Sequence, residues 1–306
     1  MRVLIVGLGS IARKHVAALR HIDPSVELYA MRSGRESKSW EGITDLYDWR
    51  QLETICFDFA IISNPTSEHM STIRKLLPFQ FPLFIEKPLY SKVVDDELIA
   101  EVKQSGIMTY VACNLRFHEC LQKTVDIIRQ HRVNEVNVYC GSYLPDWRPQ
   151  IDYRTVYSAN PEMGGGVHID LIHEVDYLYW LFGKPQCTHH LFTHKSSLGI
   201  RAIDYANYLM EYLHFNVNVI LNYYRRDYKR TLELVCSDGT FMVDLASNTI
   251  ICGNKVLFSS TKSIIDTYFS QMEYFIECVS RHRFTMNDME DDNNVLKISL
   301  QNDIER

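Results

Sequence analysis

The sequence of 306 residues lacks the features of several specialised classes of protein. No apolar stretch approaches the roughly 20 residues that a membrane-spanning helix needs, and the run Val3–Val6 ends at a glycine motif rather than continuing as a signal peptide. There is no run of Lys and Arg, and the formal net charge is -6. Nucleic acid and anionic membrane are therefore not expected partners, because both require a basic surface.

The eight cysteines lack any pattern of pairing. They contain no C-x-x-C pair, which argues against a zinc site and against a secreted disulfide scaffold. Most lie among apolar residues, which predicts buried thiols in a reducing compartment and a soluble, cytoplasmic protein.

Two further segments suggest metal ligands only weakly. His189 and His190 with His194 lie on strand-like sequence without an ordered set of partners. The acidic run from Asp288 to Asp292 is better explained as a helix N-terminus, where negative charge favours the helix dipole. We predict no metal.

The first half of the chain alternates short apolar runs with amphipathic segments, the pattern of parallel βαβ units. Predicted strands are Val3–Val6, Glu27–Met31, Phe57–Ile62, Phe81–Ile85 and Met108–Cys113, and predicted helices are Ile11–Arg20, Glu68–Leu77 and Asp95–Ser105.

The second half has a different pattern. Helices are predicted at Glu119–Gln130, Val167–Phe182, Ile265–His282 and Asp288–Asn302, and strands at Glu135–Ser142, Thr188–Thr193, Tyr205–Phe215, Asn218–Tyr224, Arg230–Cys236 and Phe241–Leu245. The predicted fold is α/β, with a dinucleotide-binding domain at residues 1–118. Residues 119–306 form an α+β domain on a mainly antiparallel open sheet.

Directly after the first apolar strand the sequence matches G-x-G-x-x-A. Gly7 permits a tight turn, Gly9 lets the backbone approach a pyrophosphate, and Ala12 lets helix and strand pack closely. Ser10 and Ile11 open a helix whose free N–H groups face the phosphates. The motif predicts a dinucleotide site; the alternative is an ordinary strand-to-helix turn.

The end of the second strand bears on the choice of cofactor. An NAD site usually has Asp or Glu there for the ribose hydroxyls, whereas this chain has Arg32 and Ser33, with Arg35 close by. An arginine pairs strongly with a 2′-phosphate, which a carboxylate would repel. NADP is favoured over NAD; the alternative is that Arg32 and Arg35 are solvated loop charges.

Four further motifs follow in order: Ser63-Asn64-Pro65-Thr66 with His69, Glu86-Lys87-Pro88, Asn114-Leu115-Arg116-Phe117, and Gly164-Gly165-Gly166 leading into Asp170, His173 and Asp176. Their order and spacing resemble the glucose–fructose oxidoreductase and inositol dehydrogenase family, the Gfo/Idh/MocA family, over nearly the whole chain.

The resemblance implies a Rossmann domain and a C-terminal α/β domain whose open sheet forms homodimers or homotetramers. It implies hydride exchange between a nicotinamide and a sugar-like hydroxyl or carbonyl. It also implies cofactor contacts from Ser63, Asn64, Pro65, His69, Glu86, Lys87 and Asn114, and a substrate contact from Arg116.

Lys87 ends an apolar strand, where the nicotinamide of such a fold should lie. The proline after it fixes the turn, and a lysine at this edge can stabilise charge on a reacting oxygen. Taken alone, Lys87 would be a surface lysine; the resemblance implies a catalytic role.

Asp170 and His173 are spaced to share a face of the predicted helix Val167–Phe182. Histidine suits removal of a hydroxyl proton because its pKa lies near neutrality. The resemblance makes His173 the general base, but the common spacing is Asp-x-x-x-His, one residue longer than here. Glu174 therefore competes for the position, and His173 can instead be a buried structural histidine.

The irregular stretch before that helix is rich in aromatic and arginine side chains, which predicts a substrate-binding loop with contacts from Trp147, Arg148, Tyr153 and Arg154 as well as from Asp170 and His173. Aromatic faces suit sugar rings and arginines suit carboxylates or phosphates, so a sugar acid or nucleotide sugar is favoured. The alternative is a subunit interface, where the same residue types are enriched.

The favoured function is an NAD(P)-dependent oxidoreductase acting on a sugar, sugar acid or nucleotide sugar. One alternative keeps the fold but recycles a tightly bound cofactor in a net elimination, hydrolysis or epimerisation. The other is a non-enzymatic NADP(H) sensor.

Overall fold

The computed structural model describes residues 1–34, 38–90 and 97–300. The chain forms two compact units, each built on one β-sheet. Of the described residues, the first unit comprises those within Met1–Asn114 and Ile264–Leu296, and the second comprises Leu115–Ser263 and residues 297–300. Arg35 and the outer ends of the predicted helices Asp95–Ser105 and Asp288–Asn302 lie outside the described residues.

The first unit contains a six-stranded parallel sheet in the order β3-β2-β1-β4-β5-β6. Its strands are β1 (Arg2–Val6), β2 (Glu27–Met31), β3 (Ile43–Leu46), β4 (Phe59–Ile62), β5 (Leu83–Ile85) and β6 (Thr109–Val111). Every residue of β4, β5 and β6 is buried, as expected for parallel strands covered on both faces. The predicted α/β class is confirmed, while β3 was missed because only Leu46 of its four residues is buried, so the strand shows no apolar run.

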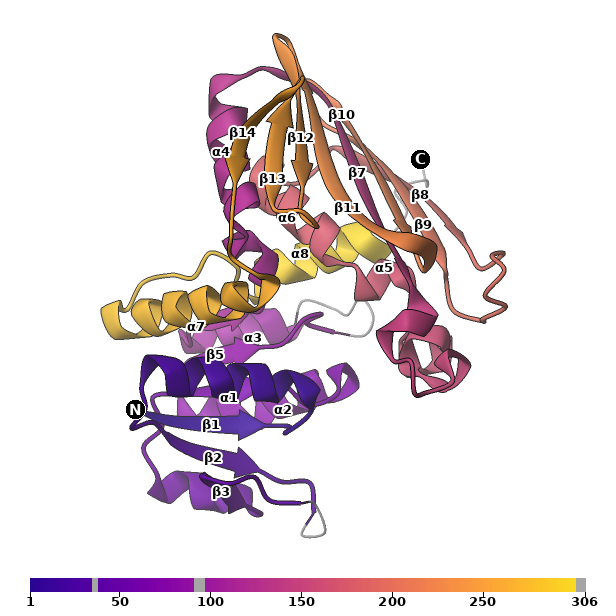
Figure 1. Ribbon diagram of the computed structural model, residues 1–306. Coiled ribbons are helices and arrows are strands. Elements are labelled where there is room, and N and C mark those ends of the chain that lie inside the picture. Colours follow the sequence, from indigo (N-terminus) through magenta and orange to yellow (C-terminus); the bar gives the residue numbers. More distant parts are fainter. Residues whose placement is uncertain (35–37, 91–96, 301–306) are drawn as a thin grey trace. The chain divides into compact units, whose positions relative to one another are not determined.

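The helices of the first unit follow the predicted alternation with the strands (Figure 1). They are α1 (Ser10–Ile22), α2 (His69–Leu76), α3 (Glu97–Ser105), α7 (Ile264–Arg281) and the first part of α8 (Met289–Leu300), with short 3-10 helices η1 (Trp49–Thr54), η2 (Thr66–Glu68) and η3 (Leu77–Phe79).

The placement of α7 corrects the predicted domain boundary, which put all of residues 119–306 in the second domain. α7 runs beside α1 (Figure 1). Its Phe275 packs against Phe59 and Phe84, with ring centroids 5.1 and 5.3 Å apart. The apolar face of α7 thus completes the core of the first unit, which the order of segments along the chain did not reveal.

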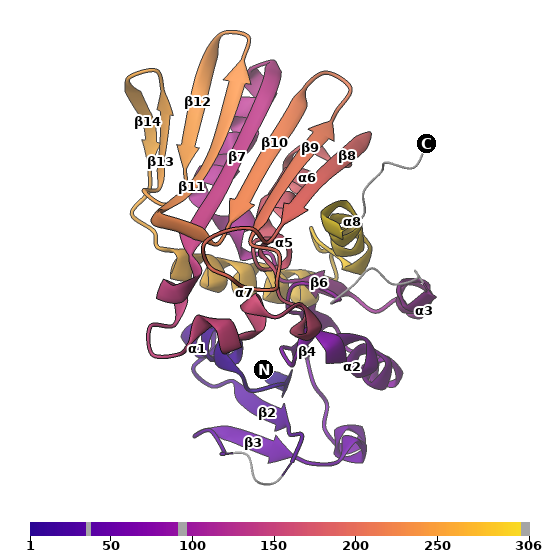
Figure 2. The same ribbon diagram turned by 90° about the vertical axis from the view of Figure 1, so that its right-hand side faces the viewer.

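The second unit contains an eight-stranded sheet in the order β14-β13-β12-β11-β7-β10-β9-β8 (Figure 2). Its strands are β7 (Val133–Tyr143), β8 (Cys187–Thr193), β9 (Tyr205–Glu211), β10 (Asn216–Asn222), β11 (Tyr224–Cys236), β12 (Gly239–Asp244), β13 (Thr249–Cys252) and β14 (Lys255–Ser259). Only β7 and β10 pair in parallel, so the predicted mainly antiparallel sheet is confirmed.

The helices of the second unit include α4 (Glu119–Gln130), which has the predicted bounds. The predicted helix Val167–Phe182 is instead two helices, α5 (Val167–Asp170) and α6 (His173–Phe182). Before them, the irregular stretch forms four 3-10 turns: η5 (Leu144–Trp147), η6 (Tyr153–Thr155), η7 (Tyr157–Ala159) and η8 (Pro161–Met163). Among the residues that the structure describes, no helix combines the length and apolar character needed to cross a membrane.

Candidate active site

The glycine turn after β1 has the geometry that a dinucleotide requires. Gly7 has a φ of +98°, and a Cβ there would lie 2.4 Å from the backbone nitrogen of Asn64, so only glycine fits. A Cβ at Gly9 would meet nothing within 4 Å, which leaves an open approach to the backbone. Ala12 is fully buried where α1 packs on the sheet.

The N-terminus of α1 is suited to a phosphate group. Its cap residue, Gly9, supplies no side-chain hydrogen bond, and the first turn, which starts with Ser10 and Ile11, holds no acidic residue. The first N–H groups of the helix and the positive end of its dipole therefore face outward, as pyrophosphate binding requires. These residues fit a nicotinamide dinucleotide.

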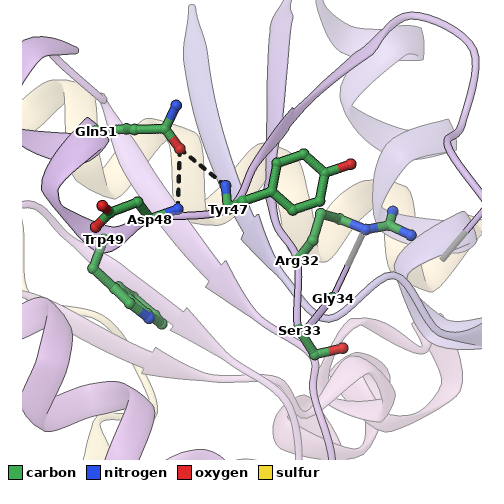
Figure 3. Close-up of a pocket in the computed structure, with 7 residues that line it drawn as sticks. All are labelled: Arg32, Ser33, Gly34, Tyr47, Asp48, Trp49 and Gln51. Atoms are coloured by element: carbon green, nitrogen blue, oxygen red, sulfur yellow. Dashed lines mark hydrogen bonds between the residues drawn. The ribbon is translucent and has the colours of Figure 1, made fainter. Parts of the chain in front are cut away.

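A cavity of about 630 Å³ lies at the end of β2 (Figure 3). Its lining includes Arg32, Ser33, Tyr47 and Trp49. Tyr47 is 40% exposed, so its ring offers a stacking surface to an adenine. Gln51 fixes the loop around the cavity because its side-chain oxygen accepts from the backbone N–H groups of Tyr47 and Asp48, at 2.9 and 3.0 Å (Figure 3).

The guanidinium of Arg32 is engaged by neighbouring groups that the sequence did not reveal. Its Nη1 lies 3.3 Å from Oδ1 of Asp45 on β3, without hydrogen-bond geometry. Its Nη2 donates to the carbonyl of Lys38 at 3.0 Å, and the Arg32 side chain is only 7% exposed. Sequence reasoning found no acid at the end of β2, and it missed Asp45 because β3 was not predicted. The neighbouring strand supplies the carboxylate.

The turn Glu86–Leu89, which contains Lys87, is held from three directions within the first unit. Buried His15 of α1 contacts Oε1 of Glu86 through Nε2 at 2.5 Å. Asp292 of α8 accepts from the backbone N–H of Leu89 at 3.1 Å. His69 of α2 lies 3.1 Å from the Leu89 carbonyl through Nδ1.

Glu86 also accepts from the backbone N–H of Lys87 at 3.3 Å, and Lys87 itself is half-exposed. The backbone that carries Lys87 is therefore fixed by side chains from α1, α2 and α8. Sequence reasoning singled out Glu86 and His69 but not His15 or Asp292, which lie far from Lys87 along the chain.

The other predicted cofactor residues of this unit mainly bind one another. Ser63 donates to the Gly7 carbonyl at 2.8 Å, and the amide of Asn64 donates to Thr72 at 2.8 Å. Buried His69 lies 3.1 Å from the Asn64 carbonyl through Nε2, so it links two turns, and burial lowers its pKa. Asn114 is buried and donates to Thr267 of α7 at 2.7 Å. Among this group, Pro65 is exposed.

In the second unit, Asp170 ends α5 and accepts hydrogen bonds from the hydroxyl groups of Tyr157 and Tyr223. Burial and the nearby Asp170 carboxylate raise the pKa of both tyrosines, so both remain neutral donors. The Asp170 carboxylate is thereby fixed in orientation, with a residue exposure of 7%. Sequence reasoning did not identify either tyrosine as a partner of Asp170, and Tyr223 lies 53 residues from Asp170 along the chain.

His173 begins α6 after a break at Leu171–Ile172, and it is half-exposed. Glu174, its competitor, has a fully buried side chain that pairs with Arg230 of β11 at 2.6 Å. Asp176 is likewise buried and pairs with Arg116 at 2.6 Å. Both neighbouring acids are thus neutralised inside the unit, while His173 remains partly accessible.

Arg116 was predicted to bind substrate, and its surroundings indicate a structural role instead. Its side chain is 2% exposed, and its Nε and Nη2 donate to the two carboxylate oxygens of Asp176. This is a buried bidentate pair, so the guanidinium is not exposed to a ligand.

The predicted substrate loop divides into two parts. Trp147 is 40% exposed and lines a cavity of about 370 Å³ together with Leu171 and, from β11, Arg226 and Tyr228. Sequence reasoning missed these two β11 residues, which a shift of strand register between Tyr224 and Lys229 brings to the cavity.

The loop residues from Arg148 onward do not line this cavity. Arg148 is exposed, the Tyr153 hydroxyl donates to the Leu198 carbonyl at 2.9 Å, and Arg154 lies over the Tyr153 ring at 4.5 Å. Tyr153 and Arg154 therefore stabilise the loop in this structure.

The parallel sheet with its glycine turn defines the first unit as a nicotinamide-dinucleotide-binding domain of an oxidoreductase. Residues 1–112 match the family model for oxidoreductases with an NAD-binding Rossmann fold, and residues 121–242 match a C-terminal domain model of the same family. The chain belongs to the Gfo/Idh/MocA oxidoreductase family, as its motifs predicted.

Relatives extend over nearly the whole chain. A myo-inositol 2-dehydrogenase from Thermotoga maritima is 24% identical over 304 residues, which cover 91% of this chain and 88% of that protein. A UDP-N-acetylglucosamine 3-dehydrogenase from Acidithiobacillus ferrooxidans has a TM-score of 0.77 at 17% identity, over 98% of this chain and 95% of that one. A scyllo-inositol dehydrogenase from Lactobacillus casei, solved with NAD(H) and scyllo-inositol, has a TM-score of 0.78 at 16% identity, over 98% and 94%. These likenesses support the fold.

Proposed function

We propose that the protein transfers a hydride between a nicotinamide cofactor and a hydroxyl or carbonyl carbon of a sugar, sugar acid or nucleotide sugar. The relatives named for inositols and a UDP-sugar support this substrate class. The observation that carries the proposal is the difference between His173 and its acidic neighbours. Glu174 and Asp176 are each paired with an arginine and buried, whereas His173 is half-exposed at the start of the same helix, so we assign the role of proton acceptor to His173.

Each residue then has a distinct role in oxidising an alcohol. Lys87 binds the reacting oxygen and stabilises the negative charge that grows on it. His173 takes the hydroxyl proton, and Asp170, oriented by its two tyrosines, supports the charge that forms on the imidazole. The bound nicotinamide supplies the hydride acceptor.

We further propose NADP as the preferred cofactor, with NAD as the alternative. Arg32 and Ser33 lie at the cavity beside β2, where the adenosine end would bind. Asp45 offsets part of the Arg32 charge, so we expect only a modest preference, about tenfold in kcat/KM, which corresponds to about 1.4 kcal/mol.

The open face of the second sheet is proposed to form a homodimer or homotetramer. Leu191 on β8 and Leu209 on β9 are 56% and 52% exposed, and such apolar side chains favour association. Light scattering coupled to size-exclusion chromatography checks this, and Leu209→Lys should reduce the mass if the face is an interface.

The function is tested by measuring cofactor binding and hydride transfer separately. Lys87→Ala and His173→Asn should bind NADPH nearly as the parent does, while kcat falls about 10²–10⁴-fold on the best substrate from a panel of polyols, sugar acids and nucleotide sugars. Lys184→Ala, at an exposed lysine, is the matched control and should keep full activity.

Normal turnover by Lys87→Ala would contradict the assignment. Cofactor that co-purifies and shows no net absorbance change during product formation would indicate the recycling chemistry instead.

A further inference from the structure

Three potential metal ligands converge on the edge strand β8 and its neighbour β9. Cys187 and His189 lie two residues apart on β8, so their side chains project to the same face of the sheet. Glu211 of β9 pairs directly with Cys187 across the two strands. Cys187 Sγ lies 3.5 Å from His189 Nε2, and Nε2 lies 3.2 Å from Glu211 Oε1.

The direction of the contacts distinguishes this cluster from a catalytic relay. In a thiol–imidazole–carboxylate relay, the carboxylate binds the ring nitrogen that faces away from the thiol. Here both Cys187 and Glu211 approach the same nitrogen, Nε2. A sulfur, a ring nitrogen and a carboxylate oxygen therefore converge on one point without the geometry of a relay, which is the arrangement that a shared cation requires.

We propose that Cys187, His189 and Glu211 form a binding site for a divalent transition metal, Zn²⁺ in the first instance. Their three ligand atoms all lie within 4.8 Å of one another. Ligands at about 2.0–2.3 Å from a tetrahedral zinc are separated by comparable distances, so only small side-chain rotations are needed. The bound cation would replace the thiol proton and compensate the thiolate and the carboxylate.

The donor set favours zinc over the hard cations. A thiolate and an imidazole are poor ligands for Mg²⁺ and Ca²⁺, which prefer oxygen, but they suit Zn²⁺ and its neighbours in the transition series. In the single subunit the side chains of His189 and Glu211 are 40% and 57% exposed, so a metal with water at its fourth position can enter before the proposed association through Leu191 and Leu209 on the same face. A cavity of about 550 Å³ lined by His189 and Glu211 lies on the same face.

The alternation of a β-strand explains why the neighbouring histidine does not contribute. His190 projects to the opposite face, where its ring lies 5.0 Å from the rings of Phe192 and Tyr208. In this part of the chain, the prediction of no metal considered only His189, His190 and His194. In the structure, the candidate ligands of His189 are Cys187 on the same face of β8 and Glu211 on β9, and His190 is not among them. The proposal rests on these contacts alone and does not depend on the proposed hydride transfer.

The test uses the full-length protein, reduced and freed of metal, titrated with Co²⁺ as an optical probe and then with Zn²⁺ in competition. We expect one equivalent of Co²⁺ to give a thiolate-to-metal charge-transfer band, which one equivalent of Zn²⁺ abolishes. Cys187→Ser should remove the band, and His189→Ala and Glu211→Gln should each weaken Zn²⁺ binding at least about tenfold.

Cys252→Ser is the matched control, because Cys252 is also half-buried and ends a strand of the same sheet. It should bind both metals as the parent does, and circular dichroism of the metal-free variants establishes that each is folded. Absence of the band in the parent, or its persistence in Cys187→Ser, would overturn the proposal. Both results are independent of dehydrogenase activity.

Discussion

The turn at Lys87 and the start of α6 at His173 are stabilised in different ways. In the first unit, His15, His69 and Asp292 hold the Lys87 turn, two of them through its backbone. In the second unit, α6 is anchored by two buried ion pairs, Glu174 with Arg230 and Asp176 with Arg116.

The two units should therefore differ in how they respond to the loss of one contact. A hydrogen bond to backbone can be replaced by a water or by another acceptor, so its loss mainly loosens a turn. A buried ion pair that loses one member leaves an uncompensated charge, which the protein interior does not tolerate. We therefore expect substitutions in the second unit to act first on stability, and substitutions around Lys87 to act first on turnover.

The largest effect is expected from the pair Arg116 and Asp176. Asp176→Ala should lower the free energy of unfolding by roughly 3–5 kcal/mol, because it leaves a buried guanidinium without its partner. The double variant Arg116→Met, Asp176→Leu should recover most of the loss, since it removes both charges. Urea denaturation measures this. An Arg116→Met protein that kept its stability but bound substrate weakly would restore the substrate role predicted from the sequence.

Acid should destabilise both units through one buried histidine in each. Burial lowers the pKa of His168 to about 4 and also lowers that of His69, below the usual value of 6.5. The unfolded chain then binds more protons in this range, so stability is fully present above pH 6.5 and falls as the pH drops toward 4. For His168 the loss is about 3 kcal/mol.

Urea unfolding between pH 7 and pH 4.5 measures this slope. His168→Phe should flatten it, whereas His214→Phe, at an exposed histidine, should not. An unchanged slope in His168→Phe would contradict the assignment.

Removing a support of the Lys87 turn should affect turnover more than binding. Asp292→Ala deprives the Leu89 N–H of its acceptor, a contact to a charged group that contributes roughly 1.5–3 kcal/mol. We expect kcat to fall about tenfold with little change in the KM for the cofactor, because the Lys87 backbone is less well positioned. Asp292→Asn keeps an acceptor and should recover part of the rate.

Glu290→Ala removes a neighbouring acid that pairs with Lys103 at the surface, and it should leave kcat unchanged. If kcat fell equally in Asp292→Ala and Asp292→Asn, the result would argue against Asp292 as a positioning residue.

The smallest effect is expected at the cofactor cavity. Asp45→Asn removes the charge opposite Arg32 and should raise the NADP preference, measured as the ratio of kcat/KM values, by up to about tenfold. Arg32→Ala should remove the preference. A ratio that favoured NAD in the parent and did not respond to either substitution would show that this arginine does not select the cofactor.

The first unit was predicted well because its signals are local. Strand, glycine turn and helix follow one another within the first 22 residues, and backbone geometry at Gly7 dictates the residue type. In the second unit, helix periodicity predicted one helix from Val167 to Phe182, but the structure has a break after Asp170. Tyr157 and Tyr223 bind Asp170 before the break, and Arg116 and Arg230 bind the acids of α6 after it. All of these partners except Tyr157 lie more than 50 residues away along the chain, which periodicity cannot reveal.

By itself the sequence determined the family, the dinucleotide turn at Gly7 and Gly9, and the position of Lys87 just after a strand, because these depend on short-range spacing. The position of His173 at the start of α6 came from the structure. Tertiary structure decided which charged side chains are paired with a partner inside the protein. It neutralised Glu174, Asp176 and Arg116, and it placed Asp45 beside Arg32. It also brought Cys187 and His189 to Glu211, because strand pairing joins residues that the chain keeps apart.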